Sequence, residues 1–174
     1  ATTDTDPIDV HGHGTHVSGI VASNHSTYTG VAPDARLIAL KVCNSSGSCP
    51  NSDIIAALDW CVTNKTLFNI SVVTMSLGGG LLSSSCDTNA VANASNIAAG
   101  AGMFVTAATG NDDATSQIAA PACGSNVTAV GSVTSTDAIA SNSNRATFDT
   151  IFAPGDSITS LQVGTDGTSS QSGT

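Results

Sequence analysis

Four short apolar runs, rich in β-branched residues, recur along this chain and alternate with segments of helical character. The runs are Leu37–Val42, Ile70–Met75, Phe104–Ala108 and Val127–Val133. Because they are apolar throughout, they predict strands that are covered on both faces, as in a parallel sheet. The helical segments are His13–Ala22, Asp53–Asn64 and Asn89–Ala101. The alternation predicts an α/β fold with a mostly parallel central sheet, in a single domain over residues 1–174.

The second predicted helix carries both a start signal and an apolar stripe. Ser52 or Asp53 could cap its N-terminus with a side-chain oxygen. The residues that would then fall on one buried face are Ile54, Ile55, Leu58 and Val62.

Acidic residues outnumber basic ones in this chain. Asp and Glu total 13 against 4 Lys and Arg, which gives a formal net charge of −9 at pH 7. Nucleic acid is not an expected partner, because neutralising phosphates requires Lys and Arg. No apolar run approaches the ~20 residues that a membrane-spanning helix needs, so no association with a membrane is expected. We expect a monomer.

Five cysteines allow two disulfides with one thiol left over. Cys43 and Cys49 flank a Gly/Ser-rich loop that a short bridge could close. Cys61 falls inside the second predicted helix, where it would be a small buried apolar residue without a partner. This cysteine usage favours an oxidising compartment and therefore an extracellular protein.

The stretch from His11 to Gly19, HGHGTHVSG, places one histidine between two glycines at the start of a helix. Glycine on both sides lets other groups approach the His13 imidazole, which could act as a general base when neutral. Two other interpretations stay open. His13 and His16 could be ordinary core or surface groups, or they could bind a metal together with His11. A catalytic zinc site is disfavoured, because its usual helix signature contains a Glu and this chain has none.

Two further glycine-containing stretches follow predicted strands. Met75–Gly80 would lie at the C-terminal edge of the sheet, where α/β proteins bind ligands and where a peptide could pair as an added strand. An ordinary glycine turn is the alternative. In the stretch Phe104–Asp112, the predicted strand ends with small residues that could line a side-chain pocket, and a Gly-Asn pair follows. The amide of Asn111 in this stretch could donate a hydrogen bond to a developing oxyanion.

Taken together, these stretches resemble the subtilase family of serine peptidases from about His11 to Thr174. HGTHVSG resembles the family's histidine motif and MSLGG its substrate-binding strand. GVAPDARLIALKV and IFAPGDSI add two matches in the expected order. The resemblance implies a three-layer subtilisin-like α/β fold, and it identifies the chain as a fragment of the catalytic domain, incomplete at both ends.

The resemblance also implies roles for particular residues. His13 matches the catalytic base, and Asn111 matches the asparagine that stabilises the oxyanion. Ser76, Leu77 and Gly78 match the residues that pair with the peptide and form one wall of the specificity pocket. The opposite wall matches Ala107, Ala108, Thr109 and Gly110. Ser48, within residues 47–50, would lie in the other strand that flanks the substrate. No metal ligand is implied.

The family's triad follows the chain order Asp, His, Ser, and only the histidine is found here. The aspartate should lie on a strand well before the histidine. Asp4, Asp6 and Asp9 are too near His13 and are interpreted as solvated loop residues.

The serine is the second missing member. Ser172-Gly173-Thr174 resembles the residues that lead into the family's Gly-Thr-Ser-Met-Ala motif, so the next residue would be the nucleophile. Ser169 is an alternative nucleophile, but the usual helix does not follow it. We therefore expect the 174-residue chain to be inactive by itself.

The expected function is that of an extracellular serine endopeptidase that hydrolyses protein or peptide substrates through a Ser-His-Asp triad. A non-catalytic peptide-binding module on the same fold is the alternative. Catalysis of this kind needs no cofactor. Structural calcium is common in the family, but we assign it to no residue, since the loop Ser23–Gly30 offers no carboxylate.

Overall fold

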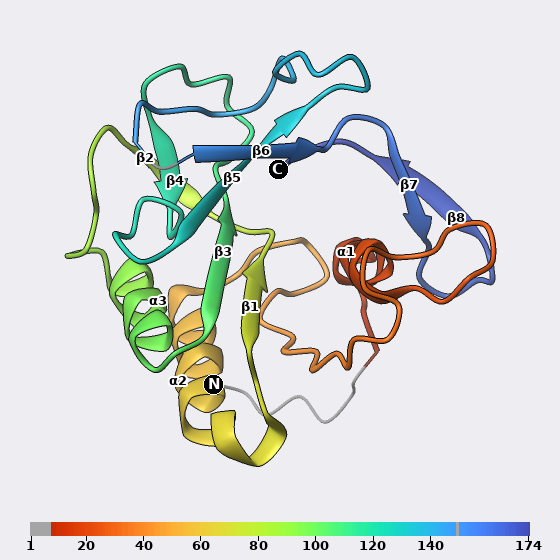
Figure 1. The fold of residues 1–174 in the computed structure, drawn as a ribbon, viewed down its shortest axis with the longest axis horizontal. Coiled ribbons are helices and arrows are strands. Elements are labelled where there is room, and N and C mark those ends of the chain that lie inside the picture. The colour runs from red at the N-terminus through yellow and green to blue at the C-terminus, as the bar shows by residue number, and fades with distance from the viewer. Residues whose placement is uncertain (1–7, 149) are drawn as a thin grey trace. The chain divides into compact units, whose positions relative to one another are not determined.

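The computed structural model describes residues 8–148 and 150–174. The chain divides into two compact units (Figure 1). The first comprises the described residues up to Pro50 together with Ser157–Gln171. The second comprises Asn51–Asp156 and Ser172–Thr174. Asp4 and Asp6 lie outside the described residues.

The second unit is built on a parallel sheet of four strands. The strands are β1 (Val72–Met75), β3 (Phe104–Ala108), β5 (Thr128–Val133) and β6 (Thr150–Pro154), in the order β1-β3-β5-β6. Helices α2 (Asn51–Phe68) and α3 (Ala90–Gly100) pack against each other, and α3 also contacts β3 (Figure 1). The predicted α/β class and parallel central sheet are confirmed.

The two faces of this sheet are covered unequally within the second unit. Val105, Ala107 and Ala129 lie on the covered face and are 1 to 2% exposed. The strand register places Val72, Phe104 and Ile151 together on the opposite face, where each is more than half exposed. The prediction that the strands are covered on both faces is therefore wrong at these three positions, where no helix of the second unit covers the apolar side chains.

The second unit also contains a short strand pair, a disulfide and a free thiol. β2 (Gly79–Leu82) and β4 (Ile118–Ala120) form an antiparallel pair. A disulfide joins Cys86 to Cys123. Cys61 is a buried free thiol on α2, as predicted.

The predicted start of α2 is wrong. The helix begins at Asn51, so Ser52 and Asp53 lie inside its first turn and do not precede it. Its far end also extends beyond the prediction, to Phe68. Ile54 and Leu58 are buried as predicted, together with Cys61.

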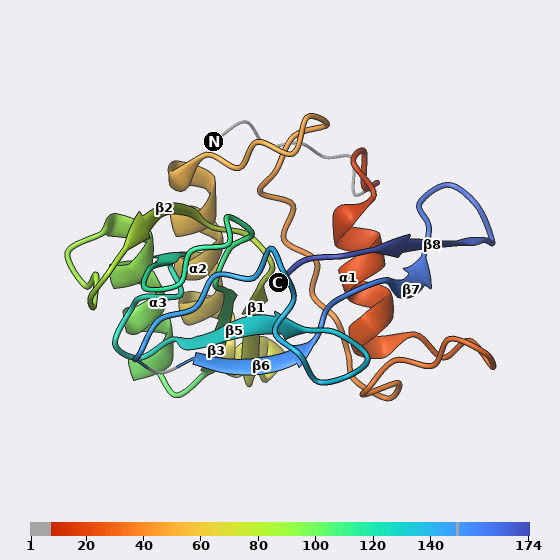
Figure 2. The ribbon, with the colours of Figure 1, turned by 90° about the horizontal axis from the view of Figure 1, so that it is seen from above.

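The first unit consists of helix α1 (His13–Ala22) packed against a hairpin of β7 (Ile158–Leu161) and β8 (Thr168–Gln171), as Figure 2 shows. His16 connects the two. Its Nε2 lies 3.1 Å from the carbonyl oxygen of Ile158 and 3.2 Å from that of Ser169. The Ser160 hydroxyl donates to the carbonyl oxygen of His16 at 2.8 Å. The predicted bounds of α1 are confirmed.

The predicted strand Leu37–Val42 does not form. Leu37, Ile38 and Leu40 are exposed by 38 to 50%. A strand requires a neighbour that accepts and donates its backbone hydrogen bonds. In the described part of the chain no segment pairs with these residues.

Replacing Asn89 by Ala should lower the free energy of unfolding by about 1 kcal/mol, the usual effect of losing an N-cap. The Asn89 side-chain oxygen accepts hydrogen bonds from the amides of Val91 and Ala92 at the start of α3. Urea unfolding measures the change. Asn93→Ala, an exposed position in the same helix, is the matched control and should be neutral or slightly stabilising. Equal effects of the two substitutions would contradict the capping role.

Candidate active site

His13 lies in the first turn of α1, and a carboxylate organises the chain around it. The N-cap residue Gly12 has φ 97° and offers no side chain to cap the helix. Asp9 takes this role instead. Its Oδ1 accepts from the amides of His11 (2.9 Å) and Gly12 (2.8 Å). Its Oδ2 accepts from the Thr15 amide (2.8 Å) and hydroxyl (2.7 Å).

The interpretation of Asp9 as a solvated loop residue is therefore wrong. Partial burial alone would raise the pKa of Asp9, but the hydrogen bonds from Gly12, Thr15 and His11 hold it well below its usual range. The carboxylate stays ionised, and its negative charge sits at the N-terminus of α1, where the helix dipole favours it. Asp9 thus fixes the turn from which the His13 side chain emerges.

The environment of His13 favours the neutral imidazole. Burial lowers the pKa of His13, and the neighbouring His11 and His16 lower it further, while Asp9 acts in the opposite direction. The ring centroids of His11 and His13 are 6.4 Å apart in an edge-on arrangement. A neutral imidazole is the form that can accept a proton.

The metal interpretation of this cluster receives no support from His16. Because both neighbours of its Nε2 are carbonyl oxygens, that nitrogen carries the hydrogen and is not free to ligate. Among the residues that the structure describes, no group of three His, Cys, Asp or Glu side chains could hold a metal ion.

Ser48 lies in an exposed loop that the predicted disulfide Cys43–Cys49 closes. Asn44 shapes this loop, since its side-chain oxygen accepts from the amides of Ser46 (2.9 Å) and Ser48 (3.1 Å). A Cβ placed on Gly47 would lie 3.0 Å from the Nε2 of His11. The first unit therefore brings the Ser48 loop beside the histidine motif.

In the second unit the two predicted pocket walls meet at the ends of adjacent strands. Met75 of β1 pairs in register with Ala107 of β3, so residues 76–78 and 107–110 follow neighbouring strands at the same edge. Gly78 lies against Ala119 and the carbonyl oxygen of Ala108. Ser76 and Leu77 are half-buried and Gly78 is exposed.

The wall residues of β3 differ in what they offer to a ligand. Ala107 and Ala108 are buried, with 2% and 8% of their surface exposed, and Gly110 is half-exposed with φ 101°. Thr109 is fully buried, and its hydroxyl has no hydrogen-bond partner among the described residues. The side chain of Thr109 therefore exposes no surface to a ligand.

Asn111 is exposed at the end of this stretch. Its Oδ1 accepts from the hydroxyl of Thr174 at 3.3 Å, and that hydroxyl also accepts from the Gly110 amide at 3.1 Å. Gly173 donates to the carbonyl oxygen of Gly155 at 2.8 Å and so holds this terminal segment. Among the described residues, the Nδ2 of Asn111 has no partner. A hydrogen-bond donor is thus left available next to Thr174.

Ser169, the alternative nucleophile, lies elsewhere. It is a strand residue of β8, paired in register with Ser160 of β7 in the first unit. Its carbonyl oxygen is one of the two that contact His16. Both observations describe a hairpin position and not a residue at the start of a helix.

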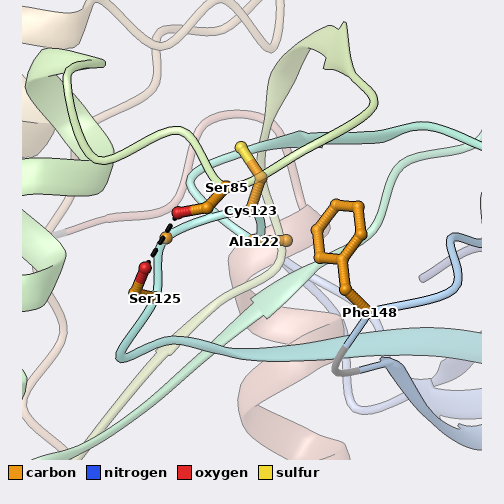
Figure 3. Close-up of a pocket in the computed structure, with 6 residues that line it drawn as sticks. Ser85, Ala122, Cys123, Ser125 and Phe148 are labelled. Atoms are coloured by element: carbon orange, nitrogen blue, oxygen red, sulfur yellow. Dashed lines mark hydrogen bonds between the residues drawn. The ribbon is translucent and has the colours of Figure 1, made fainter.

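A pocket in the second unit was not anticipated from the sequence. It is lined by Ser85, Ala122, Cys123, Gly124, Ser125 and Phe148, none of which was a predicted site residue (Figure 3). The hydroxyls of Ser85 and Ser125 point toward each other, 2.8 Å apart. Hydrogen bonds from Ser125 and Asn96 lower the pKa of the nearby Asp87 to about 2, so this carboxylate is ionised.

Comparison with known proteins agrees with the sequence motifs. The pattern of the Subtilase family matches residues 1–174. Subtilisin-like protease 1 of Arthroderma gypseum is 39% identical over 174 residues, which are 98% of this chain and 34% of that protein. A subtilisin-like protease of Coccidioides posadasii is 41% identical over 98% of this chain and 41% of its own length.

The chain belongs to the subtilase family. Its fold is subtilisin-like. It is similar to a cold-adapted subtilisin-like serine proteinase with a TM-score of 0.81 and 35% identity over 98% of this chain and 58% of that structure. It is similar to sphericase with a TM-score of 0.83 and 31% identity over 99% of this chain and 62% of that structure. This subtilase chain spans about two fifths of the length of the curated relatives that it matches.

In this subtilase chain, NMR titration of the His13 imidazole should give a pKa below the ordinary value of about 6.5. Burial and the neighbouring imidazoles disfavour the charged ring. His11→Asn should raise the midpoint by removing one of these neighbours. Asp9→Asn should lower it by removing a favourable negative charge.

His25→Asn, in an exposed turn of the same unit, is the control and should leave the titration of His13 unchanged. A His13 midpoint at or above that of a histidine in an unstructured peptide would show that its environment does not favour the neutral base.

Proposed function

We propose that this chain is part of an extracellular serine endopeptidase that hydrolyses peptide bonds through a serine acyl-enzyme. Membership of the subtilase family supports the reaction class. The observation that carries the proposal is the exposed Asn111 amide, whose Nδ2 is unpartnered among the described residues and whose Oδ1 contacts Thr174. A donor of this kind suits the charge that develops on a carbonyl oxygen during acyl transfer.

In the proposed mechanism His13 is the general base and then the general acid. A serine hydroxyl attacks the carbonyl carbon of the scissile peptide and its proton passes to the neutral imidazole of His13. The carbonyl oxygen becomes an oxyanion, to which the Asn111 Nδ2 donates a hydrogen bond. The C–N bond then breaks and the leaving amine takes the proton from His13. Water then attacks the carbonyl carbon of the ester while His13 accepts its proton. The C–O bond breaks, and the serine oxygen takes the proton back from His13.

We place the nucleophilic serine on the residue that follows Thr174 in the longer protein. The Ser172-Gly173-Thr174 sequence and the contact of the Thr174 hydroxyl with Asn111 support this placement. The orienting aspartate also belongs to the longer protein in this proposal. The 174-residue chain alone is then inactive.

The substrate is held mainly by the backbone in this proposal. Ser76, Leu77 and Gly78 pair with the peptide, which adds as a strand, and the exposed segment that contains Ser48 flanks the peptide on its other side. The segment Ala107–Gly110 forms the other wall of the pocket for the residue before the scissile bond, with Gly110 as its most exposed residue and without the buried side chain of Thr109. The reaction uses only side chains and backbone groups and requires no cofactor.

Secretion of the protein is supported by its two disulfides, Cys43–Cys49 and Cys86–Cys123, which persist in oxidising compartments. Within the described residues, no helix is both long enough and apolar enough to cross a membrane. Protein or peptide substrates follow from the proposed reaction. A monomeric state and structural calcium, which we assign to no residue, stay predictions.

The proposal is tested with the full-length protein that contains this chain, using a chromogenic peptide and a serine-reactive phosphonate. Wild-type protein should cleave the peptide and take up the phosphonate. His13→Ala should lower kcat by about 10²–10⁴-fold, the range for general acid–base catalysis. Asn111→Ala should lower it by about 10²–10³-fold, the magnitude known for an oxyanion donor of subtilisin itself.

His25→Ala is the matched control for His13, because it removes an exposed histidine of the same unit, and its activity should equal that of the wild type. Full-length protein that binds peptides but is neither active nor labelled would instead establish the non-catalytic peptide-binding module. Labelling of the 174-residue chain by itself would move the nucleophile to a serine within it, with Ser169 as the first candidate.

A further inference from the structure

Asn144 is a fully buried amide that contacts the loop carrying Asn111. Its Oδ1 accepts from the amides of Asp112 (2.8 Å) and Ala114 (3.0 Å). Its Nδ2 donates to the carbonyl oxygen of Thr109 (3.0 Å) and to the Asp112 carboxylate (3.0 Å). An asparagine side chain has two acceptor sites and two donors, so its capacity is fully used.

These hydrogen bonds lie on both sides of Asn111. Thr109 precedes it in the chain, and Asp112 and Ala114 follow it. Backbone hydrogen bonds add to the attachment, since the Asn144 amide donates to the carbonyl oxygen of Gly110 at 2.9 Å. The loop around Asn111 is therefore held at its start and at its end by one side chain.

The residues next to Asn144 extend this attachment. The Asp113 amide donates to the carbonyl oxygen of Asn142 at 3.0 Å, and the Arg145 amide donates to that of Ala114 at 2.8 Å. Arg145 also forms an ion pair with Asp113, 3.4 Å apart. Both groups of that pair are partly solvated, so it adds little. The buried amide of Asn144 is the main connection.

The chemistry of the site admits few replacements for Asn144. Aspartate would keep the shape but lose both donors, and it would place a carboxylate beside that of Asp112. An apolar residue would leave the amides of Asp112 and Ala114 without their acceptor, and a buried unpaired amide costs about 1–3 kcal/mol. A Cβ on Gly110 would collide with the Nδ2 of Asn144, so the loop backbone approaches this side chain closely.

We propose that Asn144 is the positioning residue for the oxyanion donor. It touches neither substrate nor nucleophile, and it acts by holding the loop so that the Asn111 amide stands ready before the charge develops. Preorganised donors stabilise a transition state because they need no rearrangement during the reaction. This role rests on the proposed function of Asn111.

A double-mutant cycle in the full-length protein tests the proposal. Asn144→Asp should lower kcat by up to about 10²-fold, the loss expected when a catalytic group is misplaced by about 1 Å, with little change in KM. In an Asn111→Ala background the same substitution should cost almost nothing, because the donor that it positions is already gone. Phosphonate titration of active sites corrects each kcat for protein that has not folded.

A second variant keeps the test valid if Asn144→Asp does not fold. Asp112→Asn changes an exposed partner of Asn144, and it should lower kcat several-fold with Asn111 present and leave it unchanged with Asn111→Ala. Asn93→Asp makes the same chemical change as Asn144→Asp at an exposed position on α3, and it should leave kcat unchanged in both backgrounds.

The outcomes separate this role from the proposed function. Equal losses of kcat in both backgrounds would assign Asn144 a merely structural part and overturn its positioning role, while leaving the peptidase intact. A wild-type protein without activity would overturn the proposed function and this role with it.

Discussion

The central strand β3 is hydrogen-bonded to parallel neighbours on both sides, and this pairing determines what the second unit can present to a ligand. Met75 is in register with Ala107, and Ala108 with Val130. Parallel pairing brings the carboxyl ends of strands to one edge, where α/β proteins place their ligands. Residues 76–78 and 107–111 therefore meet without any special contact between them. The apolar burial of Val105 and Ala107 under α3 keeps the register in place.

Both candidate catalytic side chains lie close to the point where a regular element begins or ends. In both units a buried or half-buried side chain accepts hydrogen bonds from the backbone amides there. Such positions leave backbone amides without partners inside the element. Asp9 accepts four hydrogen bonds in the turn of His13, and Asn144 makes four around the loop of Asn111. In each case a short polar side chain outside the turn makes these hydrogen bonds, Asp9 from a few residues before it and Asn144 from a distant part of the sequence. The His13 imidazole and the Asn111 Nδ2 are therefore not needed to hold the turns from which they extend.

The sequence predicted those features that depend on local patterns. The bounds of α1 and β3, the loop disulfide and the buried thiol of Cys61 were all predicted correctly. The failures concern partners that are distant in the chain. Residues 37–42 are apolar enough for a strand, but no described segment pairs with them. Whether an apolar face of the sheet is buried depends on which helices pack against it, and the strand sequences alone do not show this.

The same distinction applies to the candidate site. The glycine-flanked His13 and the Gly-Asn pair at Asn111 were recognised because each motif is contiguous. Asn144 was missed because it is 32 positions from Asp112 in a polar run that reads as a loop, and one sequence does not show burial. The contact between Thr174 and Asn111 was missed for the same reason. Asp9 was visible, but its closeness to His13 was taken as evidence against a role.

The most direct measurement is a crystal structure of the full-length protein inhibited by a peptidyl phosphonate, whose phosphonyl oxygen imitates the oxyanion. If the end of β3 supplies the oxyanion site, the Asn111 Nδ2 should lie about 2.7–3.1 Å from that oxygen, with the Asn144 hydrogen bonds unchanged. A phosphonyl oxygen held by other donors, with Asn111 turned away from it, would contradict the central claim that the end of β3 supplies the oxyanion site.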